Sequence, residues 1–377
     1  MNYELTGEQE LLRRTVREFA LTRVAPVAAE LDREALFPTE LVAELAELGL
    51  MGIPIPEAYG GAGADTVSYA IAIEELTRVD SSVAITVAAH TSLGTMPIYL
   101  FGNDAQKEEW LPRLASGQGL AAFGLTEPDA GSDAGATRTR AELRDGEWVV
   151  DGSKIFITNA GTDISACVTI TALTGDGEVS NLIVPNGTPG YEISAPMRKL
   201  GWHASDTREL WFKDCRVPEG NLLGERGKGF QQFMEILDGG RISVAAMGVG
   251  LAQGAYDLAF AYAQERQQFG RTISKFQAVQ FALADMATEI EAGRQLVQRA
   301  AWLKDQGKPF ALAAAQAKLY TGLLSNRAAN ASLQIHGGYG FMDEFAISRL
   351  YRDQKILEIG EGTNEVQRMV IARLLGL

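Results

Sequence analysis

Apolar residues recur at helical spacing through the first third of the chain. Leu12, Val16 and Ala20 are each four residues apart, so they share one face of a helix. Thr6, with Gln9 three residues later, has the pattern of a capping box that opens this helix. The same periodicity predicts further helices at about 38–49, 66–79 and 82–100. Residues 1–119 are therefore expected to form an all-helical N-terminal domain.

The pattern changes near residue 120. Short apolar runs, among them EWVV, ACVTITAL and NLIVP, alternate with turn dipeptides as far as residue 228. Asp151 and Gly152 are expected to form a hairpin turn between two of these strands. Helical patterns return from 229 to 377. The predicted fold is mainly α with a β insert: an N-terminal helical domain, a central antiparallel β-sandwich or barrel domain (120–228) and a C-terminal four-helix-bundle domain (229–377).

Composition limits the expected partners and compartment. A chain of 377 residues, 46% hydrophobic and 22% charged, can build two or three domains around a large core. Its formal net charge of -14 makes nucleic acid an unexpected partner. Two cysteines without close pairing, Cys167 and Cys215, favour a reducing cytoplasm. Residues 1–10 lack the pattern of a signal peptide, and no uninterrupted apolar run of about 18 residues predicts a membrane span.

Two segments of the β region contain residues suited to a flat ligand. GLTEPDAGSD, residues 124–133, forms a loop of small residues whose backbone a ligand can approach closely. In KIFITNAG, strand alternation places Phe156 and Thr158 on one face, where a ring and a hydroxyl can contact a heterocycle. Taken alone, an ordinary turn and a half-buried strand explain these segments better.

Two later segments are similarly ambiguous. ERQQFGRTISKF gathers Arg266, Arg271 and Lys275 beside Phe269, which suits a pyrophosphate, although a solvated helix end explains the charges equally well. QIHGGYGF, residues 334–341, has three glycines in four positions. These glycines fit either an emphatic helix end or the close approach of a bulky ligand.

Glu361 is the candidate base. It lies between two glycines in EIGEGTNEVQ, just before a helix for which Asn364, with Gln367, is the expected cap. A carboxylate before a helix usually serves the helix dipole at the surface, but flanking glycines allow a ligand to crowd the acid. The three histidines are not spaced as metal ligands, and HExxH, GxSxG and P-loop motifs do not occur, so no metal is expected. The GxGxxxG pattern at 248–254 lies in a helical context and favours helix packing over dinucleotide binding.

These five segments, in this order across a helical, β and helical chain, resemble the acyl-CoA dehydrogenase family. The match covers essentially the whole chain, and TEPDAGSD and EGTNEVQR are its most specific parts. The resemblance implies FAD as the cofactor and the α,β-desaturation of an acyl-CoA thioester as the reaction. The implied FAD-binding residues are Phe123, Leu125, Thr126, Ser132, Phe156, Ile157, Thr158, Arg266, Phe269, Gln277, Gln334, Ile335, His336, Gly337, Gly338, Thr363, Asn364 and Glu365.

The family places its catalytic carboxylate at one of two positions. Most members carry it before the last helix, where Glu361 stands, and an isovaleryl-type minority carries it at a site resembling Gly240. Because glycine has no acid, the resemblance assigns Glu361 as the base that takes the α-proton while the β-hydrogen leaves as hydride to flavin N5. Gly360 replaces a tyrosine common in the family, which favours a wider acyl pocket. The implied substrate contacts are Ser132, Asp238, Arg241 and Gly362.

The resemblance also implies an electron-transfer flavoprotein as acceptor and a homotetramer in which a neighbouring subunit completes the FAD site. Such enzymes serve fatty-acid or branched-chain amino-acid degradation. One alternative is an acyl-CoA oxidase-like enzyme that uses O2, but those chains are usually much longer. The other is a non-catalytic helical scaffold of the same fold, which loss of the base or the flavin loops would signal. Neither loss occurs here.

Overall fold

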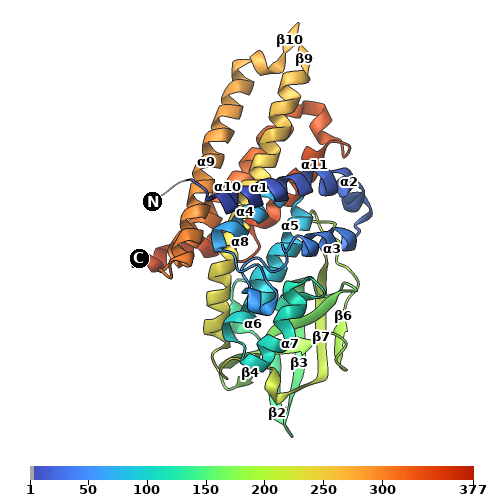
Figure 1. Cartoon of the computed structure of the whole chain (residues 1–377), viewed down its shortest axis with the longest axis vertical. Helices are drawn as coiled ribbons and strands as arrows, with labels where there is room; N and C mark the ends of the chain where they lie inside the picture. Colours follow the sequence, from blue (N-terminus) through green and yellow to red (C-terminus); the bar gives the residue numbers. More distant parts are fainter. Residues whose placement is uncertain (1–3) are drawn as a thin grey trace.

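A computed structural model describes residues 4–377, so the first three residues of the predicted N-terminal domain lie outside the described part. Its helical, β and helical order confirms the predicted fold class (Figure 1). The N-terminal helices are α1 (Gly7–Phe19), α2 (Ala25–Glu34), α3 (Thr39–Glu47), α4 (Thr66–Thr77), α5 (Ser81–Ala88), α6 (Met96–Phe101) and α7 (Asp104–Ala115). Two π-helical turns, η1 (Ala20–Val24) and η3 (Ala89–Thr95), join α1 to α2 and α5 to α6.

The predicted capping box opens α1. The Thr6 hydroxyl accepts a hydrogen bond from the Gln9 N–H at 3.2 Å, and the Gln9 side chain accepts one from the Thr6 N–H at 3.0 Å. These two bonds satisfy backbone donors that a helix start otherwise leaves unpaired. The local sequence signal therefore fixed where this helix begins.

The β region forms one eight-stranded sheet in the order β6-β7-β3-β2-β4-β5-β8, with β1 paired to β4. Its strands are β1 (Leu120–Gly124), β2 (Arg140–Arg144), β3 (Glu147–Thr158), β4 (Ser165–Gly175), β5 (Glu178–Pro185), β6 (Tyr191–Ile193), β7 (Thr207–Pro218) and β8 (Leu222–Leu223). Most pairs are antiparallel as predicted, but β4 runs parallel to both β1 and β2. A buried cluster around Trp148, Val168 and Phe212 forms the core of this sheet.

The predicted hairpin turn at Asp151 and Gly152 is wrong. Both residues lie inside β3, where the register with β7 shifts between Val150 and Gly152. The turn that joins β2 to β3 instead uses the preceding Asp-Gly pair, Asp145 and Gly146, with φ values of 52° and 82°. Long-range pairing of β3 with β7 thus decides which of two equivalent dipeptides turns the chain.

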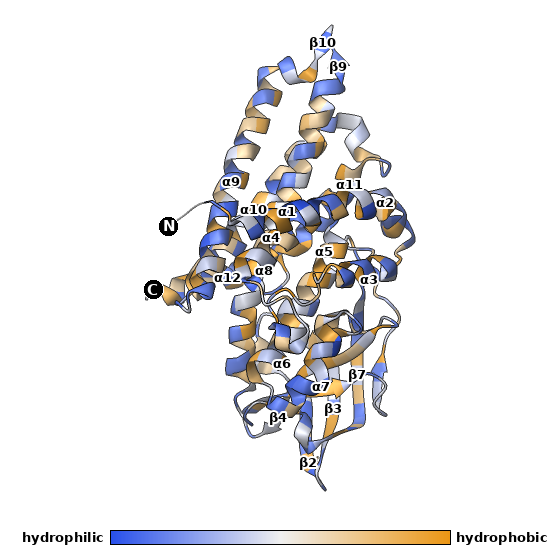
Figure 2. Ribbon diagram, in the orientation of Figure 1, coloured by the Kyte–Doolittle hydropathy of each residue, from blue (hydrophilic) through white to orange (hydrophobic). Residues whose placement is uncertain are grey.

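The C-terminal region consists of the long helices α8 (Gly229–Glu265), α9 (Gln277–Asp305) and α10 (Ala311–His336), followed by α11 (Ala346–Asp353) and α12 (Asn364–Leu374). In Figure 1, α8 runs from beside the β sheet to the far end of the molecule, where the short strands β9 (Gln267–Gln268) and β10 (Arg271–Thr272) return the chain to α9. This hairpin is hydrophilic, as its blue colour in Figure 2 shows.

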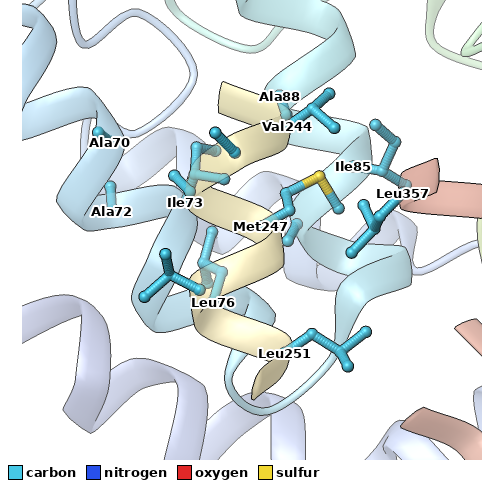
Figure 3. Packing of buried hydrophobic residues seen from close by; sticks show 14 of the residues in the cluster. Ala70, Ala72, Ile73, Leu76, Ile85, Ala88, Val244, Met247, Leu251 and Leu357 are labelled. Carbon is cyan, nitrogen blue, oxygen red and sulfur yellow. The ribbon is translucent and has the colours of Figure 1, made fainter. Parts of the chain in front are cut away.

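The N-terminal and C-terminal helices share one hydrophobic core. Met247 and Leu251 of α8 lie among Ile73 and Leu76 of α4 and Ile85 of α5 (Figure 3). Glycines of α8 allow this close packing: a Cβ on Gly250 would lie 2.3 Å from the Glu74 carbonyl oxygen. The GxGxxxG pattern therefore serves helix packing, as the sequence indicated.

Two helical stretches within residues 4–377, Ser81–Phe101 and Gly229–Glu265, are long and apolar enough to cross a membrane by length and composition. However, 78% and 67% of their most apolar windows are buried inside the protein. Their apolar character is accounted for by the shared core that they form.

Candidate active site

The turn that carries Glu361 has an uncommon backbone. Glu361 has φ of 52° and Gly362 has φ of 90°, both in the left-handed region, and only the glycine adopts it without strain. Helix α12 follows at once. Its cap is Thr363, whose hydroxyl accepts from the Val366 N–H at 3.3 Å, so the predicted cap at Asn364 is wrong by one residue. The turn directs the Glu361 side chain back toward α8.

The Glu361 carboxylate lies directly against Gly240 of α8. A Cβ built on Gly240 would be 3.0 Å from Glu361 Cδ and only 2.1 Å from Oε2, and the second distance is shorter than real Cβ contacts. That Oε2 is shut off from solvent and has no hydrogen-bond partner within residues 4–377. The absence of a side chain at 240 therefore creates the space that the carboxylate occupies, and one of its oxygens is free to accept a proton.

Two buried cations flank this carboxylate. Burial raises the pKa of Glu361 to about 7, and the charges of Lys318 in α10 and Arg241 in α8 oppose that rise. Arg241 forms an ion pair with Asp238 one turn earlier, and burial lowers the pKa of Arg241 and raises that of Asp238. Glu361 is thus poised to gain or lose a proton near neutral pH, as a general base requires.

The two segments expected to contact a flavin are joined to each other. The Ile155 N–H of β3 donates to the Thr126 carbonyl of the 124–133 loop at 2.9 Å. Phe156, the next residue, has φ of 63° and is 62% exposed at a register shift between β3 and β7. An exposed aromatic ring can stack against a flat ligand, and a strained backbone is common at ligand sites. Ile157 is buried and Thr158 is half-buried beside it.

A buried ion pair between Lys154 of β3 and Glu127 holds the 124–133 loop against this strand. Lys154 is fully buried and its Nζ donates to Glu127 Oε1 at 2.7 Å and to the Leu125 carbonyl at 3.2 Å. Burial alone would raise the pKa of Glu127, but the charge of Lys154 and the hydrogen bonds lower it to about 2. Burial lowers the pKa of Lys154 to about 8. Both groups are therefore charged at neutral pH, and neither was singled out from the sequence.

The remaining predicted residues of the first segment are either buried against α8 or exposed on the loop. Phe123 is buried in a small apolar cluster with Phe233 and Ile236 of α8, against which Leu125 packs. Ser132 is exposed on the loop. The apolar residues of this segment therefore pack against α8, and the Ser132 side chain is exposed.

A second predicted group lies far along α8. Arg266, Ile335, His336, Gly337 and Gly338 line a cavity of about 620 Å³, together with Tyr262, Gln268, Ile273, Tyr339 and Met342. The His336 ring stacks on Tyr262 at 4.4 Å between centroids, and Arg266 lies 5.2 Å from the centre of the Tyr339 ring. A cation and aromatic rings around one cavity suit a nucleotide.

Other predicted residues do not line this cavity. Phe269 is 92% exposed at the tip of the β9–β10 hairpin, and Gln277 and Gln334 are exposed nearby. Glu365 is exposed at the start of α12, whereas Asn364 is buried and donates to Glu358 at 3.4 Å. Within residues 4–377, none of these five residues lines the second cavity.

Models of the acyl-CoA dehydrogenase N-terminal, middle and C-terminal domains match residues 6–118, 122–215 and 227–376. The Bacillus subtilis (strain 168) protein named "Probable acyl-CoA dehydrogenase YngJ" is 52% identical over 100% of both chains. The short-chain specific acyl-CoA dehydrogenase of Clostridium acetobutylicum is 45% identical over 99% of both.

Solved structures agree with these matches. Butyryl-CoA dehydrogenase from Megasphaera elsdenii has a TM-score of 0.97 at 43% identity and covers 100% of both chains. A structure described as the electron transferring flavoprotein of Acidaminococcus fermentans has a TM-score of 0.97 at 44% identity, covering 100% of this chain and 99% of that one. An acyl-CoA dehydrogenase of Bacillus anthracis complexed with FAD has a TM-score of 0.94 at 34% identity, covering 99% and 67%.

The chain belongs to the acyl-CoA dehydrogenase family. It is accordingly a flavoprotein oxidoreductase whose cofactor is FAD, and the exposed Phe156, the joined loop and strand and the unpartnered Glu361 oxygen fit that group. The resemblance read from the sequence is confirmed.

Proposed function

We propose that this enzyme desaturates short acyl-CoA thioesters between the α and β carbons, with Glu361 as the base. The observation that carries the assignment is the unpartnered, solvent-shielded Oε2 of Glu361 in a site where burial brings its pKa to about 7. The preference for short chains is supported by relatives named for short-chain acyl-CoA and butyryl-CoA. A prolyl acyl carrier protein oxidase, AnaB, is also similar, at 31% identity, but this is lower than the 45% and 43% of the two dehydrogenases, so the oxygen-using alternative is not favoured.

The chain's own residues account for the proton step. The Glu361 carboxylate accepts the α-proton at Oε2, and the electron pair of that C–H bond moves into the developing enolate. Bound FAD would supply the acceptor for the β-hydrogen and its electron pair, and the pair released at the α-carbon would then form the α,β double bond. Arg241 and Lys318 supply positive charge around the carboxylate, and Phe123, Phe233 and Ile236 form a buried apolar cluster between β1 and α8.

The cofactor and partners follow from the same proposal. Phe123, Leu125, Thr126, Phe156 and Thr158 would hold the flavin ring, with Ser132 at the rim near the thioester. The cavity around Arg266 and His336 would take the adenosine diphosphate part from a neighbouring subunit of a homotetramer. An electron-transfer flavoprotein is the proposed acceptor, supported by the similar chain from Acidaminococcus fermentans. A cytoplasmic location fits the two free, buried cysteines.

The test is the visible spectrum of the purified protein before and after anaerobic addition of butyryl-, isobutyryl- and octanoyl-CoA. The flavin band should bleach fastest with butyryl-CoA. Glu361→Gln should retain FAD and its band but lose bleaching by about 10²- to 10⁴-fold, the usual contribution of a general base. Normal bleaching by that variant would overturn the assignment of the base, and a colourless protein would overturn the cofactor.

A further inference from the structure

Lys318 is a fully buried cation in the first third of α10. Its Nζ donates to the Gly362 carbonyl at 2.8 Å, and no other hydrogen bond of this ammonium is made within residues 4–377. An ammonium has three donors, and burying it with one acceptor is costly unless nearby negative charge compensates. A lysine in this position therefore needs a reason beyond packing.

The carbonyl that Lys318 binds belongs to the left-handed turn of Glu361 and Gly362. The Gln367 side chain donates to the same carbonyl at 3.0 Å and to the Glu361 carbonyl at 3.2 Å. A non-glycine residue with φ of 52° persists only where its surroundings hold it. Lys318 and Gln367 are the two side chains that hold this turn.

The positive charge of Lys318 also stabilises the ionised Glu361 carboxylate. The charged groups that act on Glu361 are Lys318 from α10 and Arg241 from α8. Tyr69 from α4 is also coupled to Glu361, but burial raises the pKa of this phenol, so it is neutral. Burial and the like charge of Arg241 lower the pKa of Lys318 to about 8, against the raising effects of Glu361, Glu358 and Glu365. Arg241 is already paired with Asp238, whereas Lys318 has no carboxylate of its own. Of these two cations, Lys318 therefore has the larger effect on Glu361.

We propose that Lys318 is a positioning residue for Glu361, which fixes the turn that aims the carboxylate at Gly240 and whose charge keeps that carboxylate ionised near neutral pH. The inference rests on the proposed function of Glu361 as the base. It assigns to one ammonium both the geometry and the protonation state of the reacting group.

The test compares Lys318→Met with Gln367→Met in the full-length, FAD-loaded enzyme. Lys318→Met removes a donor and a charge, whereas Gln367→Met removes donors alone. The rate of flavin bleaching by butyryl-CoA is measured against pH. Flavin bleaching should be slower in both variants. Only Lys318→Met should move the acid side of the rate–pH profile to higher pH, by about one unit, because it removes a positive charge that lowers the pKa of the Glu361 carboxyl. Lys355→Met, which removes an exposed lysine from the preceding turn, is the matched control and should move nothing.

A second readout does not depend on turnover. The infrared band of the protonated Glu361 carboxyl, identified by its loss in Glu361→Gln, is titrated with pH in wild type and in Lys318→Met. The midpoint should rise by a similar amount in the variant. If Lys318→Met does not fold, Lys318→Gln is the second neutral variant, because it keeps a donor for the Gly362 carbonyl. Lys318→Arg keeps the charge and should show the wild-type midpoint.

The outcomes separate the two proposals. If wild type is not bleached by any acyl-CoA, the proposed function fails, and the infrared midpoint still tests the coupling of Lys318 to Glu361. If wild type is bleached and the midpoint and acid limb of folded Lys318→Met or Lys318→Gln equal those of wild type, Lys318 has no such role.

Discussion

Glu361 Oε2 and the α-carbon of Gly240 approach each other so closely that a Cβ on residue 240 would lie 2.1 Å from this oxygen. The two positions at which the family places its catalytic carboxylate are therefore mutually exclusive in this site. A side chain at 240 and the present position of Glu361 cannot coexist. The relationship explains why a glycine stands at a helix interior, where it is otherwise unfavourable.

Gly240→Ala is expected to displace the Glu361 carboxylate and slow the bleaching of flavin by butyryl-CoA by about 10²-fold, the cost of misplacing a reacting group by about 1 Å. Gly239→Ala is the matched control, because its Cβ would meet only the flexible Lys304 Nζ at 3.3 Å. That variant should keep its rate and gain up to about 1 kcal/mol in stability from helix propensity. Equal rates in the two variants would show that the contact with Gly240 does not matter.

Glu361 should destabilise the folded protein above neutral pH. Burial raises its pKa from 4.5 to about 7, so between these values the folded state binds a proton that the unfolded state has lost. Stability from this group therefore falls as pH rises from 4.5 to 7, by up to roughly 3 kcal/mol at ~1.4 kcal/mol per pKa unit. Glu361→Gln should accordingly raise the unfolding free energy more at pH 8 than at pH 4.5, measured by urea denaturation. A pH-independent difference would contradict the raised pKa.

Lys154→Met should lower stability by about 3 to 5 kcal/mol and weaken FAD retention, because it leaves Glu127 charged, buried and unpaired beneath the loop. The double variant Lys154→Met/Glu127→Gln should recover part of that loss. Arg138→Met, which breaks the exposed pair with Asp129 on the same loop, should change stability by less than about 1 kcal/mol. Urea unfolding and the ratio of flavin to protein absorbance measure both effects, and a loss in Arg138→Met as large as in Lys154→Met would refute the distinction.

Arg266→Met is expected to reduce FAD retention while leaving the acid limb of the bleaching rate unchanged, since it removes a cation from the second cavity and not from the surroundings of Glu361. Arg271→Met provides the comparison: this arginine lies against the Phe276 ring, 4.4 Å from its centre, and does not line the cavity. FAD affinity is measured by titrating the apoprotein. Equal affinities in the two variants would remove the second cavity from the cofactor site.

The sequence was most informative where the signal is local. The capping box of Thr6 and the glycines around Glu361 are read from a few consecutive residues, and both features are present in the structure. The cap of α12 was misplaced because Thr363 and Asn364 are both good caps. The left-handed conformations of Glu361 and Gly362 decide between them by starting the helix at Asn364.

Lys318 and Lys154 could not be found in this way. Each lies in a pattern that is equally typical of a solvated surface: Lys318 in an alanine-rich helix and Lys154 in an alternating strand. Their burial depends on what packs over them from distant parts of the chain, the 361–363 turn in one case and the 124–139 segment in the other. The burial of a single lysine therefore cannot be predicted from the residues next to it in the sequence.

The length of α8 has a consequence for the size of the working unit. Gly240, beside the base, lies about a third of the way along α8, and Arg266, at the second cavity, follows the last residue of the same continuous helix. At ~1.5 Å per residue, they are roughly 40 Å apart, farther than an extended FAD molecule can reach. One cofactor therefore cannot bridge both places on a single polypeptide. If both bind FAD, each copy holds the ring of one cofactor and the tail of another, and a lone protomer contains two halves of different sites.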